Sequence, residues 1–401
     1  MLEYLGILQR LTTDEFHEFA CYYNLYRLCH SYIINKLPVS YEKLLLINMS
    51  SHIRCSNFEL MRLICMFGII AMHTCSFLVI NPSKGMLLEL DAINTVFNTG
   101  VSLFVLISGY FGIKTKAKKI FAFWIQVLFC SILSFIIVSI VNASFSLKDC
   151  IYSFLPIISN KYWFATSYLV LMILAPILNK AADHLDQSSF KKVIICCLVL
   201  FSIVPSFFYL SVPGCGKGIL HFIMMYLIGC YISRYCCNVN INKKKTTVVL
   251  FILFFIIFSI NYISTVLYWS YFDNHCVIFP MSRDCSLLIV VSSLLIFFIF
   301  KSCEFKSLFL NKMASYVFYM YLLESSFRKA LNTYIRLEDY TNIFVFPFML
   351  IIYVIFIMVL CAITGVVHRL AFGRIELWFW TKIEKSLTSI CKWLKFDDRH
   401  F

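Results

Sequence analysis

Residues 56–80 read SNFELMRLICMFGIIAMHTCSFLVI, which is apolar enough for a membrane helix but contains Glu59, Arg62 and His73. On an α-helix, with 100° between successive residues, these three side chains fall within an arc of about 60°. At 1.5 Å per residue, Arg62 and His73 lie about 16 Å apart along the axis. The spacing therefore predicts one polar row along one face of a membrane-spanning helix.

The composition of the whole chain indicates a multi-pass membrane protein. Of its 401 residues, 61% are hydrophobic and 14% are charged, and the mean hydropathy is +0.82. A soluble protein of this size would have to expose an apolar surface, so these values exclude that class. The net charge of +14 does not indicate nucleic-acid binding, because membrane proteins concentrate Lys and Arg in their cytoplasmic loops. Paired Cys motifs of the zinc-binding kind do not occur in the sequence, and we expect no metal site.

Charge-poor stretches predict an all-α bundle of about ten transmembrane helices. The expected spans are 63–83, 92–113, 120–142, 162–179, 193–211, 218–233, 246–268, 285–300, 313–326 and 343–367. With the N-terminus inside, 21 Lys and Arg lie in the inner segments and 8 in the outer loops, leaving 6 in residues 1–62 (21 + 8 + 6 gives the 35 of the chain). This asymmetry follows the positive-inside rule and predicts that both termini are cytoplasmic. The asymmetry holds only if the short span 313–326 crosses the membrane.

In this orientation Arg62 lies at the cytoplasmic mouth of its helix and His73 near the middle of the bilayer. Ionisable groups at that depth are costly, and they usually mark a functional path inside the bundle. A neutral imidazole can take a proton from a hydroxyl, and a guanidinium can hold a phosphorylated ligand that enters from the cytosol. A structural alternative stays open, in which His73 packs against a neighbouring helix and Glu59 pairs with Arg62 as an ordinary i, i+3 ion pair.

Five stretches in order along the chain resemble the acyltransferase-3 family of integral-membrane acyltransferases. They are NFELMRLICMFGIIAMH with its Arg-x10-His spacing, GVSLFVLISGYFGIKTK, NKYWFATSYLVLMILAPILNK, MMYLIGCYISRY and ASYVFYMYLLESSFRKAL. The resemblance covers about residues 55–370. One departure concerns the last stretch, where Leu323 stands at a position that is His in many relatives and Glu324 follows it. Glu324 and Arg328 have the i, i+4 spacing of a simple ion pair.

The resemblance implies an O-acyltransferase that moves an acetyl or similar group from acetyl-CoA, or another acyl-CoA, to a sugar hydroxyl. The acceptor would be a surface polysaccharide or a lipid-linked glycan, and the location would be the inner (cytoplasmic) membrane. By the same resemblance His73 is the expected catalytic residue and Arg62 its partner, with Glu59 supporting Arg62. Other polysaccharide-assembly proteins are expected partners, and nucleic acid is not.

Further candidates carry two interpretations each. The lysines of the basic loop, Lys114, Lys116, Lys118 and Lys119, either set the topology and touch lipid headgroups or bind the phosphates of coenzyme A. Ser108 and Tyr110, in the SGY motif, either permit close helix packing or contact the donor. Asn98 either bonds across the bundle or lines an acceptor path. Tyr162 and Trp163 belong either to an interfacial belt or to an aromatic platform for a sugar.

We divide the chain into an N-terminal extension (1–54), a transmembrane acyltransferase domain (55–370) and a basic cytoplasmic tail (371–401). The extension is either an amphipathic surface segment or an untranslated leader upstream of Met49. Two other functions remain: a transporter or flippase for a lipid-linked glycan, in which the polar row lines the path, and a membrane scaffold without activity.

Overall fold

The computed structural model describes residues 55–76, 86–208, 217–237, 239–272, 276–340, 342 and 344–393. The predicted N-terminal extension lies outside these residues, as does the far end of the predicted tail. Helices dominate the part that is described, which confirms the all-α class. A helix overlaps the described part of each of the ten predicted spans.

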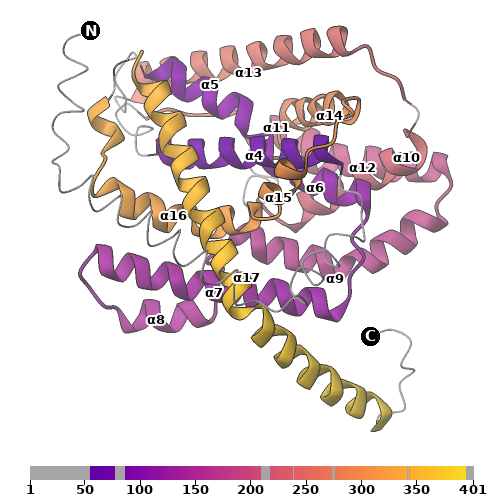
Figure 1. Ribbon diagram of the computed structural model, residues 1–401. Coiled ribbons are helices and arrows are strands. Elements are labelled where there is room, and N and C mark those ends of the chain that lie inside the picture. The colour runs from indigo at the N-terminus through magenta and orange to yellow at the C-terminus, as the bar shows by residue number, and fades with distance from the viewer. Residues whose placement is uncertain are drawn as a thin grey trace. The chain divides into compact units, whose positions relative to one another are not determined.

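Figure 1 shows how the helices of the described residues follow one another along the chain. Their bounds are α4 Ser56–Thr74, α5 Leu87–Phe97, α6 Gly100–Phe111, α7 Ala117–Val141, α8 Leu147–Phe154, α9 Trp163–His184, α10 Gln187–Leu198, α11 Val204–Phe207, α12 Ile219–Tyr235, α13 Lys243–Phe272, α14 Leu287–Lys301, α15 Leu308–Ala314, α16 Val317–Asn332 and α17 Phe346–Trp393. A π-helical turn, Val199–Ile203, joins α10 to α11, and a 3₁₀ turn, Leu337–Tyr340, precedes α17.

Length and composition identify six membrane-crossing candidates among the described residues. These are Leu87–Phe111, Ala117–Val141, Trp163–His184, Gln187–Phe207, Lys243–Phe272 and Phe346–Glu384, with the shorter apolar helices Ile219–Tyr235 and Leu287–Lys301 beside them. The protein is therefore a multi-pass membrane protein. Helix α4 is not among them, because its charged and polar residues replace part of the apolar surface that a lipid-facing helix needs. Helix α16, with 16 residues, is too short.

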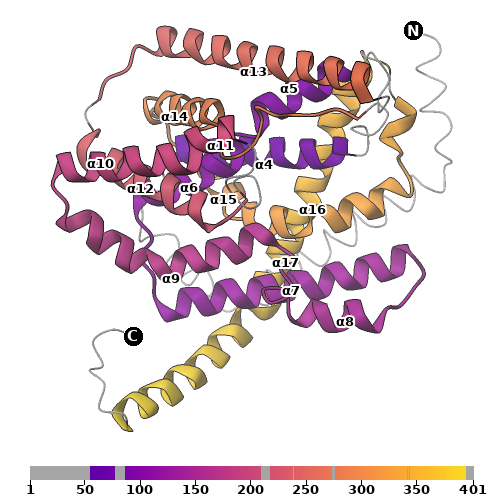
Figure 2. The same ribbon diagram turned by 180° about the vertical axis from the view of Figure 1, so that it is seen from behind.

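Helix α4 is the central element of the described bundle. It contacts α5, α6, α14, α15, α16 and α17, and both views show it between α13 on one side and α7 on the other (Figures 1 and 2). Ile64 is the one large apolar side chain between Ser56 and Thr74 that is exposed. A helix enclosed in this way presents most of its side chains to neighbouring helices.

Three boundaries differ from the predicted ones. The second span is two helices, because the chain turns at Asn98 and Thr99 between α5 and α6. The weak span 313–326 is in fact the end of α15, a break at Ser315, and then α16, and Arg369 donates to the freed Ser315 carbonyl at 2.7 Å. The boundary at 370/371 lies within α17, which continues through the start of the predicted tail and extends beyond the other helices in both views.

Helices α6 and α12 pack very closely against each other. A Cβ on Gly109 would lie 2.1 Å from the carbonyl oxygen of Tyr226, and one on Gly229 would lie 2.4 Å from that of Leu106. Only hydrogen in place of a side chain permits such an approach. The central residue of the SGY motif is therefore required for packing.

Candidate active site

The start of α4 is fastened to the end of α14 and the start of α15. Ser307 donates its N–H to the Ser56 hydroxyl at 2.8 Å, and the Asn57 amide donates to the Phe300 carbonyl at 2.9 Å. These bonds fix the axial position and the rotation of α4. They therefore also set the direction in which the polar residues further along α4 point.

Glu59 and Arg62 form the predicted ion pair one turn inside α4. Nη1 of Arg62 donates to Oε1 of Glu59 at 2.9 Å. Glu59 is 5% exposed, whereas 28% of the Arg62 side chain remains accessible. A buried carboxylate holds one edge of the guanidinium, and the accessible part can receive an anion.

At the other end of α4, His73 meets Glu324 of α16. Nδ1 of His73 lies 2.9 Å from Oε1 of Glu324, and Nε of Arg328 donates to the other carboxylate oxygen at 3.4 Å. The Glu324 side chain is 6% exposed, whereas 44% of the His73 side chain is accessible. The predicted Glu324–Arg328 pair is thus present, and the carboxylate also binds the histidine.

The pairing fixes the chemistry of the imidazole. An ionised carboxylate only accepts hydrogen bonds, and Nε of Arg328 donates to the second oxygen of Glu324. Beside such a carboxylate, Nδ1 of His73 is the donor, and Nε2 is the ring nitrogen that can accept a proton. An imidazole oriented by a carboxylate in this way is suited to act as a general base.

Neighbouring residues of α16 hold Glu324 in place. Leu323 is fully buried in the core, and Ser326 and Ser134 of α7 share a hydrogen bond. The Tyr321 hydroxyl accepts the N–H of Phe164 at 3.2 Å. Leu323 therefore serves packing, whereas the adjacent Glu324 supplies the polar contact to α4.

The predicted basic loop follows α6 and is firmly positioned. Tyr226 accepts the Ile113 N–H at 2.9 Å, Asn179 donates to the Ile113 carbonyl at 3.1 Å, and Thr115 donates to the Met172 carbonyl at 2.7 Å. The lysines that follow, Lys114, Lys116, Lys118 and Lys119, are exposed. Lys119 also donates to the Lys114 carbonyl at 3.2 Å.

Tyr110 lies at the Arg62 end of α4. Its ring centroid is 5.5 Å from that of Phe58 and 5.2 Å from that of Phe297. Since the basic loop begins directly after this residue, the loop starts at the same end of α4 as Arg62. Ser108 bonds the Phe104 carbonyl at 2.9 Å and the Tyr168 hydroxyl at 3.1 Å, so its hydroxyl is engaged within the protein.

Asn98 bonds across the bundle, as one of its two interpretations requires. Its amide donates to the Ser282 carbonyl, and it lies near the buried carboxyl of Asp284, whose pKa burial raises and Asn98 lowers. One turn further, Ser102 lies 2.9 Å from Nε2 of His221. The Asn98–Asp284 contact is a polar cluster that the sequence patterns did not indicate, because its two members come from distant segments.

Tyr162 and Trp163 differ in their surroundings. Tyr162 is buried, with its ring centroid 6.2 Å from that of Tyr321. Trp163 contacts Phe222 at 6.2 Å between centroids, and the ammonium of Lys217 lies 6.0 Å from its ring centroid. The two residues thus join the start of α9 to α16 and to α12.

These contacts define a helical membrane protein in which a carboxylate–histidine pair joins the central helix α4 to α16. The profile of the acyltransferase domain matches residues 56–366, well over half of the chain, and the protein belongs to the acyltransferase-3 family. It is therefore an acyltransferase that uses an acyl donor and an acceptor. Searches of curated proteins and of solved structures gave no match.

Proposed function

We propose that this protein is an O-acyltransferase that moves an acetyl or similar group from acyl-CoA to a hydroxyl of a surface polysaccharide or glycolipid. The observation that carries this proposal is the hydrogen bond between His73 and Glu324. It supplies an oriented, accessible base on the helix that also carries Arg62.

In the proposed reaction, Nε2 of His73 takes the proton of the acceptor hydroxyl. The hydroxyl oxygen attacks the thioester carbonyl, the C–S bond breaks, and the imidazolium returns its proton to the leaving thiolate. The products are an ester and free coenzyme A thiol. Glu324 stabilises the imidazolium while it exists, and Arg328 holds the second oxygen of Glu324. Transient transfer of the acyl group to His73 is the covalent variant of this scheme.

The donor would enter at the Arg62 end of α4. Support comes from the accessible guanidinium held by Glu59 and from four exposed lysines that follow α6. Lys114 and Lys116 lie on the loop, and Lys118 and Lys119 lie in the first turn of α7. Such cations suit the phosphates of coenzyme A. The separation of about 16 Å between Arg62 and His73 along the axis would allow phosphates at the mouth and a thioester near His73.

The acceptor would approach from the Trp163 side. Trp163 supplies an aromatic face next to Lys217, and the contact between Phe164 and Tyr321, 5.3 Å between centroids, leads toward Glu324 on the same helix. Tyr162 and Asn98 would support this region through packing and hydrogen bonds. In this proposal about ten helices cross the inner membrane, with both termini cytoplasmic.

The test compares surface glycan from cells with and without this chain. Ester-linked acyl groups should be present only when the chain is expressed, and purified protein in detergent should bind labelled acetyl-CoA. A transporter would alter the amount of surface glycan without binding acetyl-CoA. Identical acylation in both strains would contradict the proposal.

A further inference from the structure

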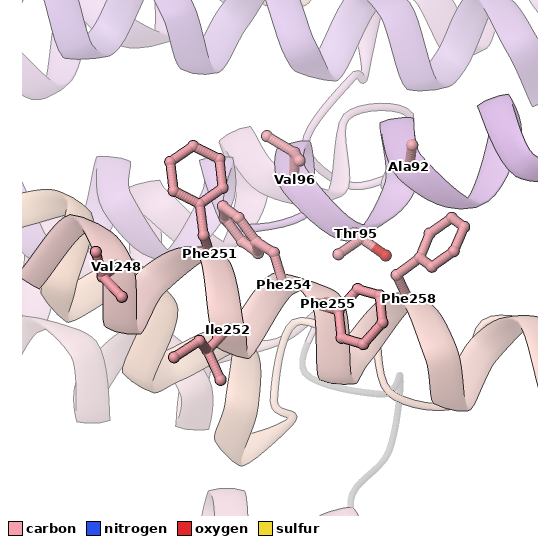
Figure 3. A pocket seen from close by; sticks show the side chains of 9 residues that line it. All are labelled: Ala92, Thr95, Val96, Val248, Phe251, Ile252, Phe254, Phe255 and Phe258. Carbon is pink, nitrogen blue, oxygen red and sulfur yellow. The ribbon is translucent and has the colours of Figure 1, made fainter.

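A second feature lies between α5 and α13, away from the His73–Glu324 pair. A groove of about 590 Å³ falls within the range of ligand pockets. Its lining is apolar, with Phe rings of α13 opposite small side chains of α5 (Figure 3). The lining residues are Ala92, Thr95, Val96, Val248, Phe251, Ile252, Phe254, Phe255 and Phe258.

The groove offers a ligand almost nothing to hydrogen-bond. The Thr95 hydroxyl, which lines the groove, already donates to Oδ1 of Asp91 at 3.2 Å within the protein. Asp91 in turn accepts from the Asn261 amide at 3.1 Å, behind the groove. A space with such walls, between two membrane-crossing candidates, excludes water and favours hydrocarbon.

The walls are open to the surroundings along α13. Phe251 is 67% exposed and Phe255 is 70% exposed. Rings that line a groove and also face outward within a membrane contact lipid chains directly. Hydrocarbon can therefore enter from the side, without passing through the bundle.

Charge at one end of the groove identifies the headgroup. Helix α13 begins with Lys243, Lys244 and Lys245, which are all exposed. The side chain of Asn242, just before them, accepts the Lys245 N–H at 3.1 Å. Lys244 precedes Val248 by four residues and Phe251 by seven, so the three share one helix face. The groove face of α13 thus ends in a lysine.

The dimensions match one leaflet of a bilayer. From Lys244, the groove residues Val248 and Phe258 lie about 6 and 21 Å along the axis, so the groove is about 15 Å long at 1.5 Å per residue. Half of a hydrocarbon core of ~30 Å is the same length. A chain in the groove would end near the bilayer centre, with its phosphate beside the lysines.

We propose that this groove binds one hydrocarbon chain of an anionic phospholipid, whose phosphate is held by Lys243, Lys244 and Lys245. The inference is independent of the acyl-transfer chemistry. In this proposal the α5–α13 face prefers lipids with an anionic headgroup. An ordinary apolar surface would be covered by any lipid equally.

The test uses the purified chain in nanodiscs that contain phosphatidylglycerol or phosphatidylcholine with a photoactivatable acyl chain. We expect cross-links within residues 248–258, with phosphatidylglycerol labelling at least roughly fivefold above phosphatidylcholine, the preference that one lysine near a membrane surface provides. Replacing all three lysines by Gln should lower labelling to the phosphatidylcholine level. Replacing exposed Lys191 and Lys192 of α10 by Gln is the charge control.

A second pair of variants tests the groove itself. Val248→Trp should fill it and reduce labelling by both lipids, whereas Val249→Trp, exposed on the adjacent face, should leave labelling unchanged. Equal labelling of the unmodified chain by the two lipids would overturn the proposal. This comparison needs no variant, so it does not depend on whether a variant folds. Undiminished labelling in a folded Val248→Trp variant would also overturn it.

Discussion

Nδ1 of His73 and Oε1 of Glu324 lie 2.9 Å apart, although 251 residues separate them in the chain. The contact joins the central helix α4 to α16. From the sequence alone, His73 could serve only packing. The contact shows that it is one half of a carboxylate–imidazole pair. Its other ring nitrogen is then free to accept a proton.

The first prediction concerns Glu324. Glu324→Gln keeps the shape but removes the charge that orients and stabilises the imidazolium, so we expect acyl transfer to fall by about 10²- to 10⁴-fold, as for general-base catalysis. The rate of transfer from labelled acetyl-CoA in purified protein measures this. Glu304→Gln, at an exposed position, is the control, and equal rates in the two variants would count against the pair.

The second prediction separates donor binding from chemistry. Arg62→Lys retains a cation but loses the planar fork that Glu59 holds at one edge. We expect KM for acyl-CoA to rise about tenfold or more, the effect of losing one charge-assisted hydrogen bond, with a smaller change in kcat. Arg234→Lys, paired with Asp183 elsewhere, should leave KM unchanged. A fall in kcat at constant KM would instead assign Arg62 to the chemical step.

A third prediction addresses packing at the SGY motif. Gly109→Ala would put a methyl group 2.1 Å from the Tyr226 carbonyl oxygen, and α6 and α12 would have to separate. We expect a loss of about 1–3 kcal/mol, the range for overpacking. Thermal unfolding in detergent measures it. Gly373→Ala meets nothing within 4 Å and should be neutral or slightly stabilising.

The fourth prediction is a pH dependence. Asp284 lies in the irregular segment between α13 and α14, where burial raises the pKa of its carboxyl to about 6, against the opposing effects of Lys217 and Asn98. The ordinary value is about 3.9. Between these values the folded state binds more protons than the unfolded state, so stability falls as pH rises from about 4 to about 6.

Asp284→Asn should remove that dependence. At pH 7.5 the variant should be more stable than the unmodified chain by up to about 3 kcal/mol, at 1.36 kcal/mol for each pKa unit. At pH 4 the difference should be small. Thermal unfolding at both values measures this, with Asp149→Asn as the exposed control. A constant difference between the two chains across this range would contradict the prediction.

The fold class and the helix positions follow from the sequence because lipid imposes a strong local constraint. Apolar stretches of about 20 residues are visible without knowledge of any neighbour. The breaks are not visible in the same way. The turn at Asn98 accompanies its hydrogen bond to Ser282, and the break at Ser315 accompanies its bond from Arg369, both between segments distant in sequence.

The candidate site was partly predictable for the same reason. Glu59, Arg62 and His73 lie on one helix, and helical periodicity alone aligns them. The sequence singled out Glu324 as the i, i+4 partner of Arg328 and as the residue after Leu323, without linking it to His73. Its bond to His73 depends on how α4 packs against α16, and no local pattern encodes that contact.

The most direct test of the account is the rate of acyl transfer from labelled acetyl-CoA by a His73→Ala variant at matched expression and folding, beside the exposed control His184→Ala. The account predicts that His73→Ala abolishes measurable transfer while His184→Ala retains the full rate. Transfer by His73→Ala at the rate of the unmodified chain would contradict it.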